Sequence, residues 1–262
     1  MSKKKINIMN KIIPCEINGY KILWYDSLTS TNDKATELAL TNEDEHTAII
    51  ADYQTKGRGQ RQNNWESEKG KNLTFSLILR PTFLSAENQF LLSKIASLAV
   101  CDYLKSVGLT PTIKWPNDIY TGDRKICGML IENSLIGSGI SFSVIGIGVN
   151  LNQEQFTNSV LNPVSVFQKT GKTTDIFEAL NNLLVFIDKR YQLLKNNNTE
   201  KINTDYFENL YRRNGFHLYE SNGKRFKAKI INILNTGELV LEDEKGTVSH
   251  FAFKEVNFIL NE

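Results

Sequence analysis

The first half of the chain alternates between short apolar runs and longer helical patterns. Apolar runs rich in β-branched and aromatic residues predict three strands, at 20–27, 47–54 and 73–80. Segment 30–42 predicts a helix, and its start at Ser30 and Thr31 offers the hydroxyl side chains that cap helices. The apolar residues of segment 86–107 recur at helical spacing and predict a second helix.

The second half predicts a hairpin, two helices and a strand-rich end. Segment 119–134 reads as a hairpin that turns at Thr-Gly-Asp, and 141–150 as a further strand. Two helical patterns fill 174–213, interrupted by the polar run 195–200, which predicts a loop. Short alternating strands follow from 214 onward. We therefore expect an α+β protein with a mixed, largely antiparallel sheet over 1–213 and a small β-barrel over 214–262.

Composition narrows the class of protein. A chain of 262 residues with 40% hydrophobic residues can bury a sizeable core. Its 31 Lys and Arg nearly balance 29 Asp and Glu, so the bulk charge gives no case for nucleic-acid binding. The three cysteines are far apart and match no metal or disulfide pattern, and neither a signal peptide nor a membrane span is apparent. We expect a reduced, cytoplasmic setting.

The stretch DYQTKGRGQRQNNWES (52–67) follows a predicted strand and fits no periodic template. Gly57 and Gly59 allow backbone N–H groups to approach a ligand closely, while Lys56, Arg58 and Arg61 supply positive charge. The spacing matches neither a P-loop nor a dinucleotide-binding loop. An anion-binding loop and a solvated, mobile loop both remain open on these residues alone.

Three further segments combine turn residues, charge and glycine. In KWPND (114–118) the proline interrupts a strand, so the following Asn and Asp project from a corner, although such residues are also ordinary turn formers. In DRKICGMLIEN (123–133) a glycine stands inside a strand of large side chains, where it marks either a bulge or a close ligand. In GIGVN (146–150) two glycines open one face of a strand.

Together these segments resemble the biotin protein ligases. The resemblance extends over most of the chain, and the order and spacing of its motifs are specific: STN (30–32), GRGQRQNNWES (57–67), KGKNLTFSL (69–77), KWPNDIY (114–120), DRKICGMLIE (123–132) and GIGVNLN (146–152). The strand-rich end resembles the family's SH3-like C-terminal domain. The resemblance implies an enzyme that activates biotin with ATP to biotinoyl-5′-AMP and transfers biotin to a lysine of a biotin carboxyl carrier protein. It also allows a homodimer.

The resemblance assigns roles to individual residues. Lys125 would contact the reacting carboxylate and phosphate, Arg58 the same region, and Asp118 a magnesium ion. Such cations are needed because two anions about 4 Å apart repel by roughly 4 kcal/mol at an effective dielectric near 20. Trp65 would stack on adenine, and Asn117 would be the adenine-side amide.

The full set of expected site residues falls into four groups. Catalytic roles are expected for Lys125, Arg58 and Lys114. Biotin contacts are expected from Ser30, Thr31, Asn32, Gln54, Gly57, Arg58, Gly59, Gln60, Lys125, Gly128, Gly146 and Gly148. ATP contacts are expected from Arg58, Trp65, Lys114, Asn117, Lys125 and Asn150. Asp118 is the expected metal ligand.

Two positions depart from the family's common glycine motif, GRGRxGR. Gln60 stands where many members have Arg, and Gln62 where they have Gly. The departure bears on how tightly a closed loop retains the adenylate.

Three other functions were weighed. A lipoate ligase or octanoyltransferase has a related catalytic domain, but the KWPND motif and the C-terminal strands favour biotin. A DNA-binding repressor is disfavoured because only about 19 residues precede the first predicted strand, which indicates a short form without a helix-turn-helix domain. A biotin acceptor is disfavoured because the chain has no Met-Lys-Met sequence.

Overall fold

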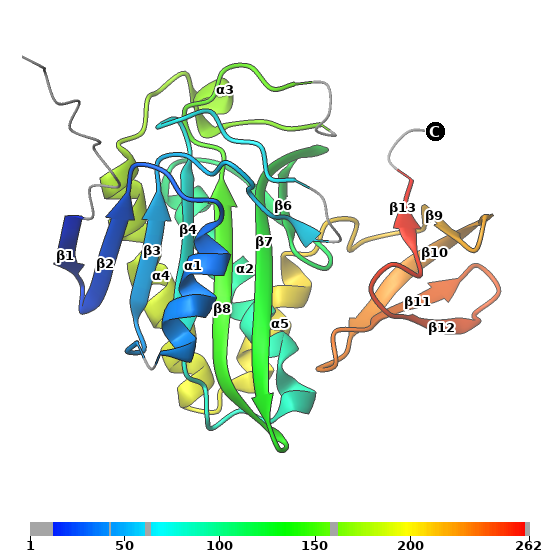
Figure 1. Cartoon of the computed structure of the whole chain (residues 1–262). Coiled ribbons are helices and arrows are strands. Elements are labelled where there is room, and N and C mark those ends of the chain that lie inside the picture. The colour runs from blue at the N-terminus through cyan, green and yellow to red at the C-terminus, as the bar shows by residue number, and fades with distance from the viewer. Residues whose placement is uncertain (1–12, 42, 61–63, 158–161, 260–262) are drawn as a thin grey trace, which may run out of the picture.

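A large mixed sheet forms the body of the protein (Figure 1). The computed structural model describes residues 13–41, 43–60, 64–157 and 162–259. Within them the sheet has the strand order β1-β2-β3-β4-β8-β7-β6-β5. Its strands are β1 (Ile13–Ile17), β2 (Tyr20–Tyr25), β3 (Thr47–Ala51), β4 (Leu73–Leu79), β5 (Pro111–Lys114), β6 (Asp118–Thr121), β7 (Arg124–Ile136) and β8 (Gly139–Val149). β2 and β3 run parallel, and the other neighbouring pairs are antiparallel.

Helices cover the two faces of this sheet unequally. α1 (Thr31–Leu40) lies in front of β3, β4 and β8 in Figure 1 and covers only part of that face. Behind the sheet lie α2 (Phe90–Ser106), α4 (Ile176–Lys195) and α5 (Thr199–Glu208). Two short elements are the 3₁₀ turn η2 (Ala86–Asn88) and α3 (Val166–Thr170). The uncovered part of the front face is the space available to a ligand.

Local sequence explains the two elements that frame that space. Every residue of β3 and β4 is buried, because helices or other chain segments cover both faces, and both strands therefore read as apolar runs. α1 begins where Ser30, in an extended conformation, accepts a hydrogen bond from the Asp33 backbone N–H. A side-chain cap of this kind stabilises a helix by about 0.5–2 kcal/mol and fixes its first turn.

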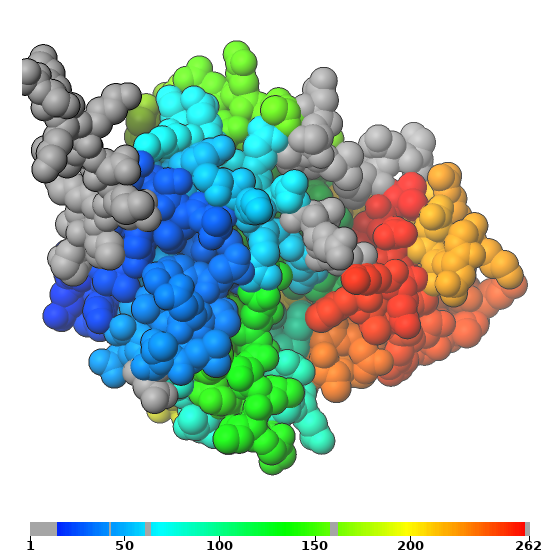
Figure 2. Space-filling model, in the orientation of Figure 1, coloured from blue at the N-terminus to red at the C-terminus, as the bar shows by residue number. Residues whose placement is uncertain are grey.

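A second, five-stranded antiparallel sheet follows α5 and forms a lobe beside the main body (Figures 1 and 2). Its order is β12-β11-β10-β9-β13, with bounds β9 (His217–Ser221), β10 (Lys224–Ile233), β11 (Leu239–Asp243), β12 (Val248–Phe251) and β13 (Asn257–Phe258). It contacts the body through Trp115, whose indole N–H donates to the Gly237 carbonyl at 2.8 Å. The buried Lys94 of α2 also reaches it, donating to the Ile233 carbonyl at 3.1 Å.

The structure confirms the predicted fold class: a mixed, mostly antiparallel sheet with helices and a separate C-terminal β-structure. The hairpin turn at Thr121–Asp123 is also confirmed, with Gly122 at a φ of +58°. The division of the chain at residue 213 stays a prediction.

Several details of the sequence prediction were wrong. The first strand begins at Ile13, not at residue 20. The predicted loop 195–200 shrinks to three residues, because Lys195 ends α4 and Thr199 begins α5. β5 and α3 were not predicted as separate elements; both are too short for periodicity to reveal them. Within the described residues, no helix is both long and apolar enough to cross a membrane.

Candidate functional site

A row of paired residues crosses five strands on the open face of the sheet. Thr74 of β4 pairs with Gly148 of β8, Gly148 with Gly128 of β7, Gly128 with Asp118 of β6, and Asp118 with Lys114 of β5. Directly paired residues project to the same face of a sheet, so the row is a trough with a bare glycine floor at its centre. Four inter-strand steps of about 4.8 Å give it a length of about 19 Å.

A β-bulge turns Lys125 into this trough. Tyr120 pairs with Lys125 and Ile119 with Cys127, so Ile126 is an extra residue in β7. In a regular strand, positions 125 and 128 would face opposite sides, but the extra residue brings Lys125 to the same face as Gly128. The Lys125 Nζ accordingly lies 2.7 Å from a carboxylate oxygen of Asp118.

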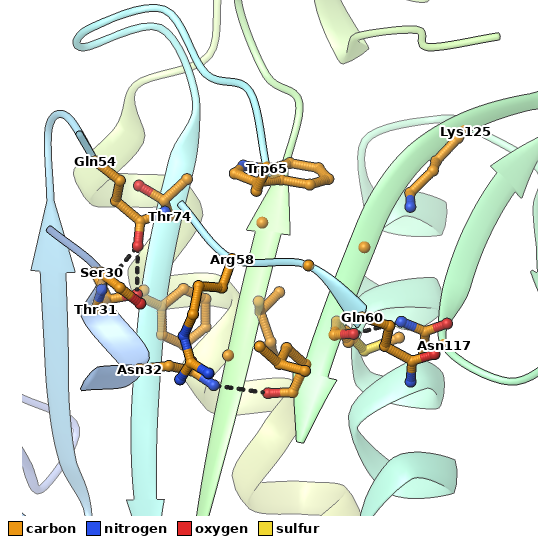
Figure 3. A pocket seen from close by; sticks show the side chains of 18 residues that line it. Ser30, Thr31, Asn32, Gln54, Arg58, Gln60, Trp65, Thr74, Asn117 and Lys125 are labelled. Carbon is orange, nitrogen blue, oxygen red and sulfur yellow. Dashed lines mark hydrogen bonds between the residues drawn. The ribbon is translucent and has the colours of Figure 1, made fainter. Parts of the chain in front are cut away.

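Trp65 lies over the glycine floor (Figure 3). A Cβ atom built on Gly148 would lie 2.6 Å from the indole Cζ2, and one built on Gly128 would lie 3.0 Å from Cζ3. The indole position therefore excludes a side chain at Gly148 and leaves almost no room for one at Gly128. Gly57 supports the same arrangement from the loop, since its carbonyl accepts from the Trp65 backbone N–H at 2.9 Å and a Cβ there would meet the Trp65 carbonyl oxygen at 2.6 Å.

One end of the pocket is a cluster of neutral hydrogen-bonding groups around the start of α1 (Figure 3). The Gln54 amide oxygen accepts from the Thr31 backbone N–H at 2.7 Å and from its hydroxyl at 3.1 Å. The Ser76 hydroxyl lies 2.6 Å from the Asn32 amide oxygen. A Cβ on Gly146 would clash with that Asn32 amide, which explains why glycine stands there.

Arg58 points away from Lys125, toward Asn32 and the sheet (Figure 3). Its guanidinium makes two hydrogen bonds to the Glu132 carboxylate, at 3.0 and 2.7 Å, and lies 2.8 Å from a carboxylate oxygen of Asp33. Partial burial lowers the pKa of Arg58, but the hydrogen bonds and the negative charge of Glu132 outweigh it, so that the pKa lies above its ordinary value. Glu132 also accepts from the Asn32 amide at 2.8 Å, so one carboxylate connects the glycine loop, α1 and β7.

The other end of the trough carries the cations Lys125 and Lys114. Lys114 lies beyond Asp118, with its Nζ 5.1 Å from the centre of the Tyr120 ring. Burial lowers the pKa of Lys114 below its ordinary value, Asp118 acts in the opposite direction, and Lys125 and Arg212 lower it further. The trough therefore has a neutral hydrogen-bonding end and a cationic end, with Trp65 between them.

Most of the residues predicted for the site surround one pocket. Of the predicted set, those that line it are Ser30, Thr31, Asn32, Gln54, Arg58, Gly59, Gln60, Trp65, Asn117, Lys125, Gly128, Gly146 and Gly148. Lys114 and Asp118 continue the trough outside this lining, and Gly57 supports Trp65 from behind. Arg61 and Gln62 lie outside the described residues.

Asn150, for which a contact with ATP is predicted, lies at the end of β8 beside the pocket lining and is not part of it. Its side chain is 3% exposed and donates to the Val164 carbonyl at 3.1 Å, and its backbone N–H donates to the Ile126 carbonyl at 2.9 Å. It ties the segment before α3 to the end of the sheet and does not line the pocket.

Sequence analysis missed several residues of the pocket. Thr74, Phe75, Met129, Leu130 and Ile147 line it, and Asp33 and Glu132 hold Arg58. Most of these lie inside the motifs already singled out, at positions that alternate with the glycines or neighbour them. The alternation of strand faces could have indicated Thr74 and Leu130.

A metal ion would have one carboxylate available in the trough. Among the described residues there is no group of three or more His, Cys, Asp or Glu side chains that could hold a metal ion. Asp118, whose carboxylate is paired with Lys125, is of the residue type that magnesium takes, since this ion typically binds one or two carboxylates and completes its shell with phosphate oxygens and water.

The fold and the trough define a class of protein. Residues 24–150, which contain the motif segments as far as β8, match the model of the biotin/lipoate A/B protein ligase family. The solved biotin protein ligase of Aquifex aeolicus, in complex with biotin and ATP, has a similar fold, with a TM-score of 0.76 and 24% identity. The match covers 90% of this chain and 97% of that one.

Curated relatives are more similar in sequence. The bifunctional ligase/repressor BirA of Bacillus subtilis (strain 168) is 34% identical over 181 residues, covering 68% of this chain. The biotin--[acetyl-CoA-carboxylase] ligase of Paracoccus denitrificans is 37% identical over 142 residues, covering 50% of this chain. The matched stretch spans 55% and 57% of the length of these relatives, respectively.

Proposed function

We propose that this protein is an ATP-dependent biotin protein ligase. It condenses biotin with ATP to biotinoyl-5′-AMP, releases pyrophosphate, and transfers biotin to a lysine of a biotin carboxyl carrier protein. The observation that carries the proposal is the trough from Gln54 to Lys114, with neutral hydrogen-bonding groups at one end and cations at the other. The name of the Paracoccus denitrificans relative, biotin--[acetyl-CoA-carboxylase] ligase, supports the same reading.

The neutral end suits the ureido ring of biotin. A ureido group carries two N–H donors and one carbonyl acceptor, and the side chains of Ser30, Thr31 and Gln54 offer both kinds of partner. Phe75, Met129 and Ile147 supply apolar contacts beside them. A pocket that is mostly apolar, with a few convergent polar groups, is the usual design for a small-molecule site.

The cationic end suits the meeting of two anions. The biotin carboxylate must approach the α-phosphate of ATP, and Lys125, directed into the trough by the bulge, offsets their repulsion. Lys114 adds a second positive charge further along the trough, and Asp118 would hold magnesium, which neutralises phosphate charge. Arg58 is paired with Glu132 and Asp33, so we assign it to holding the glycine loop on the sheet.

The loop containing Trp65 would shield the product. A mixed anhydride is hydrolysed if water reaches it, and an indole over the glycine floor excludes water from the centre of the trough. The carrier lysine then attacks the biotinoyl carbonyl and AMP leaves. A cytoplasmic location, a carrier protein as partner and a homodimer complete the proposal.

The experiment is an adenylation assay with purified protein, ATP and magnesium, in which biotin, lipoate or octanoate is the only acid present. Mass spectrometry should detect biotinoyl-AMP with biotin and little adenylate with the other two acids. Addition of a carrier domain should then move biotin onto one lysine. A preference for lipoate or octanoate would refute the proposal, and tight sequence-selective binding to duplex DNA would add a function that it does not include.

A further inference from the structure

Lys114 lies between two aromatic rings that come from different sheets. Its Nζ is 5.1 Å from the ring centre of Tyr120 in β6 and 5.5 Å from that of Phe258 in β13. β13 belongs to the C-terminal sheet, so the cationic end of the trough borders that sheet. In the part of the chain that the structure describes, the Lys114 ammonium has neither a hydrogen-bond nor an ion-pair partner, whereas Lys125 is paired with Asp118.

An aromatic setting holds a cation without cancelling its charge. Asp118 stands opposite Lys114 in the sheet but forms its ion pair with Lys125, and a carboxylate paired with Lys114 itself would compete with an incoming phosphate. The faces of Tyr120 and Phe258 attract the ammonium through their quadrupoles instead, a contact typically worth a few-fold to tens-fold in an equilibrium constant. The Lys114 ammonium therefore has no ion-pair partner among the described residues and is available to an anion in the trough.

The position of Phe258 depends on the C-terminal sheet. Phe258 pairs with Tyr219 of β9, and their ring centres are 5.1 Å apart. Its neighbour Ile259 accepts, through its carbonyl, a hydrogen bond of 2.7 Å from Arg212, in the segment that joins α5 to β9. Movement of this sheet would therefore remove one of the two rings from Lys114.

We propose that Phe258 is a positioning residue of the nucleotide site: it holds the Lys114 ammonium toward the phosphates of ATP. Through Phe258, which does not itself contact ATP, the C-terminal sheet thereby affects the strength of ATP binding. This inference rests on the proposed function, because it takes the anion at Lys114 to be a nucleotide phosphate.

The test compares Phe258→Leu with Phe226→Leu. Leucine keeps an apolar side chain but has no aromatic face. Phe226 is a matched control in the same sheet, packed against Tyr219 and Phe251 at 6.1 and 5.8 Å, without a lysine over its ring. Phe258→Leu should raise the KM for ATP about three- to tenfold while the KM for biotin changes less than about twofold. Phe226→Leu should change neither, and equal effects of the two variants would overturn the inference.

A double-mutant cycle separates positioning from a general effect on folding. If Phe258 acts through Lys114, then Phe258→Leu should change the KM for ATP by less than about twofold in a Lys114→Met background. Independent, additive effects would contradict the proposal. Phe258→Tyr, which keeps the ring, should retain the parent KM even if Phe258→Leu folds poorly, and loss of ATP affinity in Phe258→Tyr would count against a role for the ring.

A binding measurement distinguishes this inference from the proposed function. If the parent makes no biotinoyl-AMP, the proposed function fails. Calorimetric titration with inorganic pyrophosphate then tests the anion site by itself, and Phe258→Leu should bind it about three- to tenfold more weakly than Phe226→Leu does. If the parent makes biotinoyl-AMP but both leucine variants behave alike, the function stands and the role of Phe258 is excluded.

Discussion

The indole of Trp65 lies directly over Gly148, so close that a Cβ atom at position 148 would be 2.6 Å from the indole Cζ2. The loop after β3 and the strand β8 are therefore fitted to each other at this point. A methyl group at position 148 would force the indole out of the trough. This would change the shape of the pocket and displace the loop that covers it.

Gly148→Ala should therefore impair adenylation strongly. Inserting a methyl group into a packed contact costs about 1–3 kcal/mol of stability. Here it would displace the loop that carries Trp65 and occupy the floor of the trough. We expect the KM values for biotin and ATP both to rise, measured by pyrophosphate release. Gly139→Ala in the same strand is the control, because a Cβ there would meet only the Ile136 carbonyl, at 3.8 Å. Similar kinetics for the two variants would show that the contact has no role in the site.

Trp65→Ala tests the proposed stacking on adenine. Stacking of a base on an aromatic side chain is worth about 1–3 kcal/mol, so the KM for ATP should rise about five- to a hundredfold, and more than the KM for biotin. The measurement is adenylate formation at varied ATP with biotin saturating, and the reverse. Equal increases for both substrates would indicate that the indole only shapes the trough.

Lys125→Ala should fold normally and make adenylate very slowly. Its ammonium is directed into the trough and offsets the repulsion between two anions mainly in the transition state, so both kcat and kcat/KM should fall about a hundred- to a thousandfold. Lys125→Arg should recover activity only in part, because a planar guanidinium does not fit the place of a compact ammonium beside Asp118.

The control for Lys125 is Lys56→Ala. Lys56 is an exposed lysine of the glycine loop, and its loss should leave pyrophosphate release near the parent value. If Lys125→Ala released pyrophosphate within about threefold of the parent, Lys125 would be only a residue of the β6–β7 hairpin.

Gln60→Arg should slow the release of biotinoyl-AMP. Gln60 lines the pocket in the glycine loop, and an arginine there could make a charge-assisted hydrogen bond to the phosphate. Dissociation is measured by chasing labelled adenylate with unlabelled biotin and ATP. Gln60→Met controls for side-chain size and should not slow release. An unchanged rate for Gln60→Arg would mean that the loop retains the adenylate without a phosphate contact at this position.

Because Lys94 is buried, we expect the free energy of unfolding to depend on pH. It is 1% exposed, and burial lowers its pKa from 10.5 to about 8. Between these pH values the unfolded chain binds more protons than the folded protein, so Lys94 makes the free energy of unfolding rise with pH. From pH 8 to 9.5 the parent should gain about 1–2 kcal/mol relative to Lys94→Met, measured by denaturant titration. Lys56→Met, at an exposed site, is the control, and the parent should gain no stability relative to it over this pH range. If the free energy of unfolding changed with pH in the same way for the parent and for Lys94→Met, the prediction would be refuted.

The sequence by itself determined the class of fold and named most of the residues that line the pocket. Apolar runs with β-branched residues revealed β2, β3, β4 and β8, because strands that are largely buried are mostly apolar. The long α2 was visible because its large apolar residues recur at helical spacing, although the helix proves to be buried on almost every side. The glycines of the trough could be recognised as candidate sites of a bulge or a close approach, since glycine weakens a strand.

Only the tertiary structure decided how these residues act together. The bulge at Ile126 directs Lys125 into the trough, and no residue pattern reveals it, because it depends on how β6 and β7 pair. Arg58 has acidic partners from α1 and β7, Asp33 and Glu132, 25 and 74 positions away in the chain, so local sequence could not show that its charge is already paired. Lys114 likewise meets Phe258 across two sheets. Such long-range contacts follow from strand order and domain packing, whereas periodicity reports only the local preference of each segment.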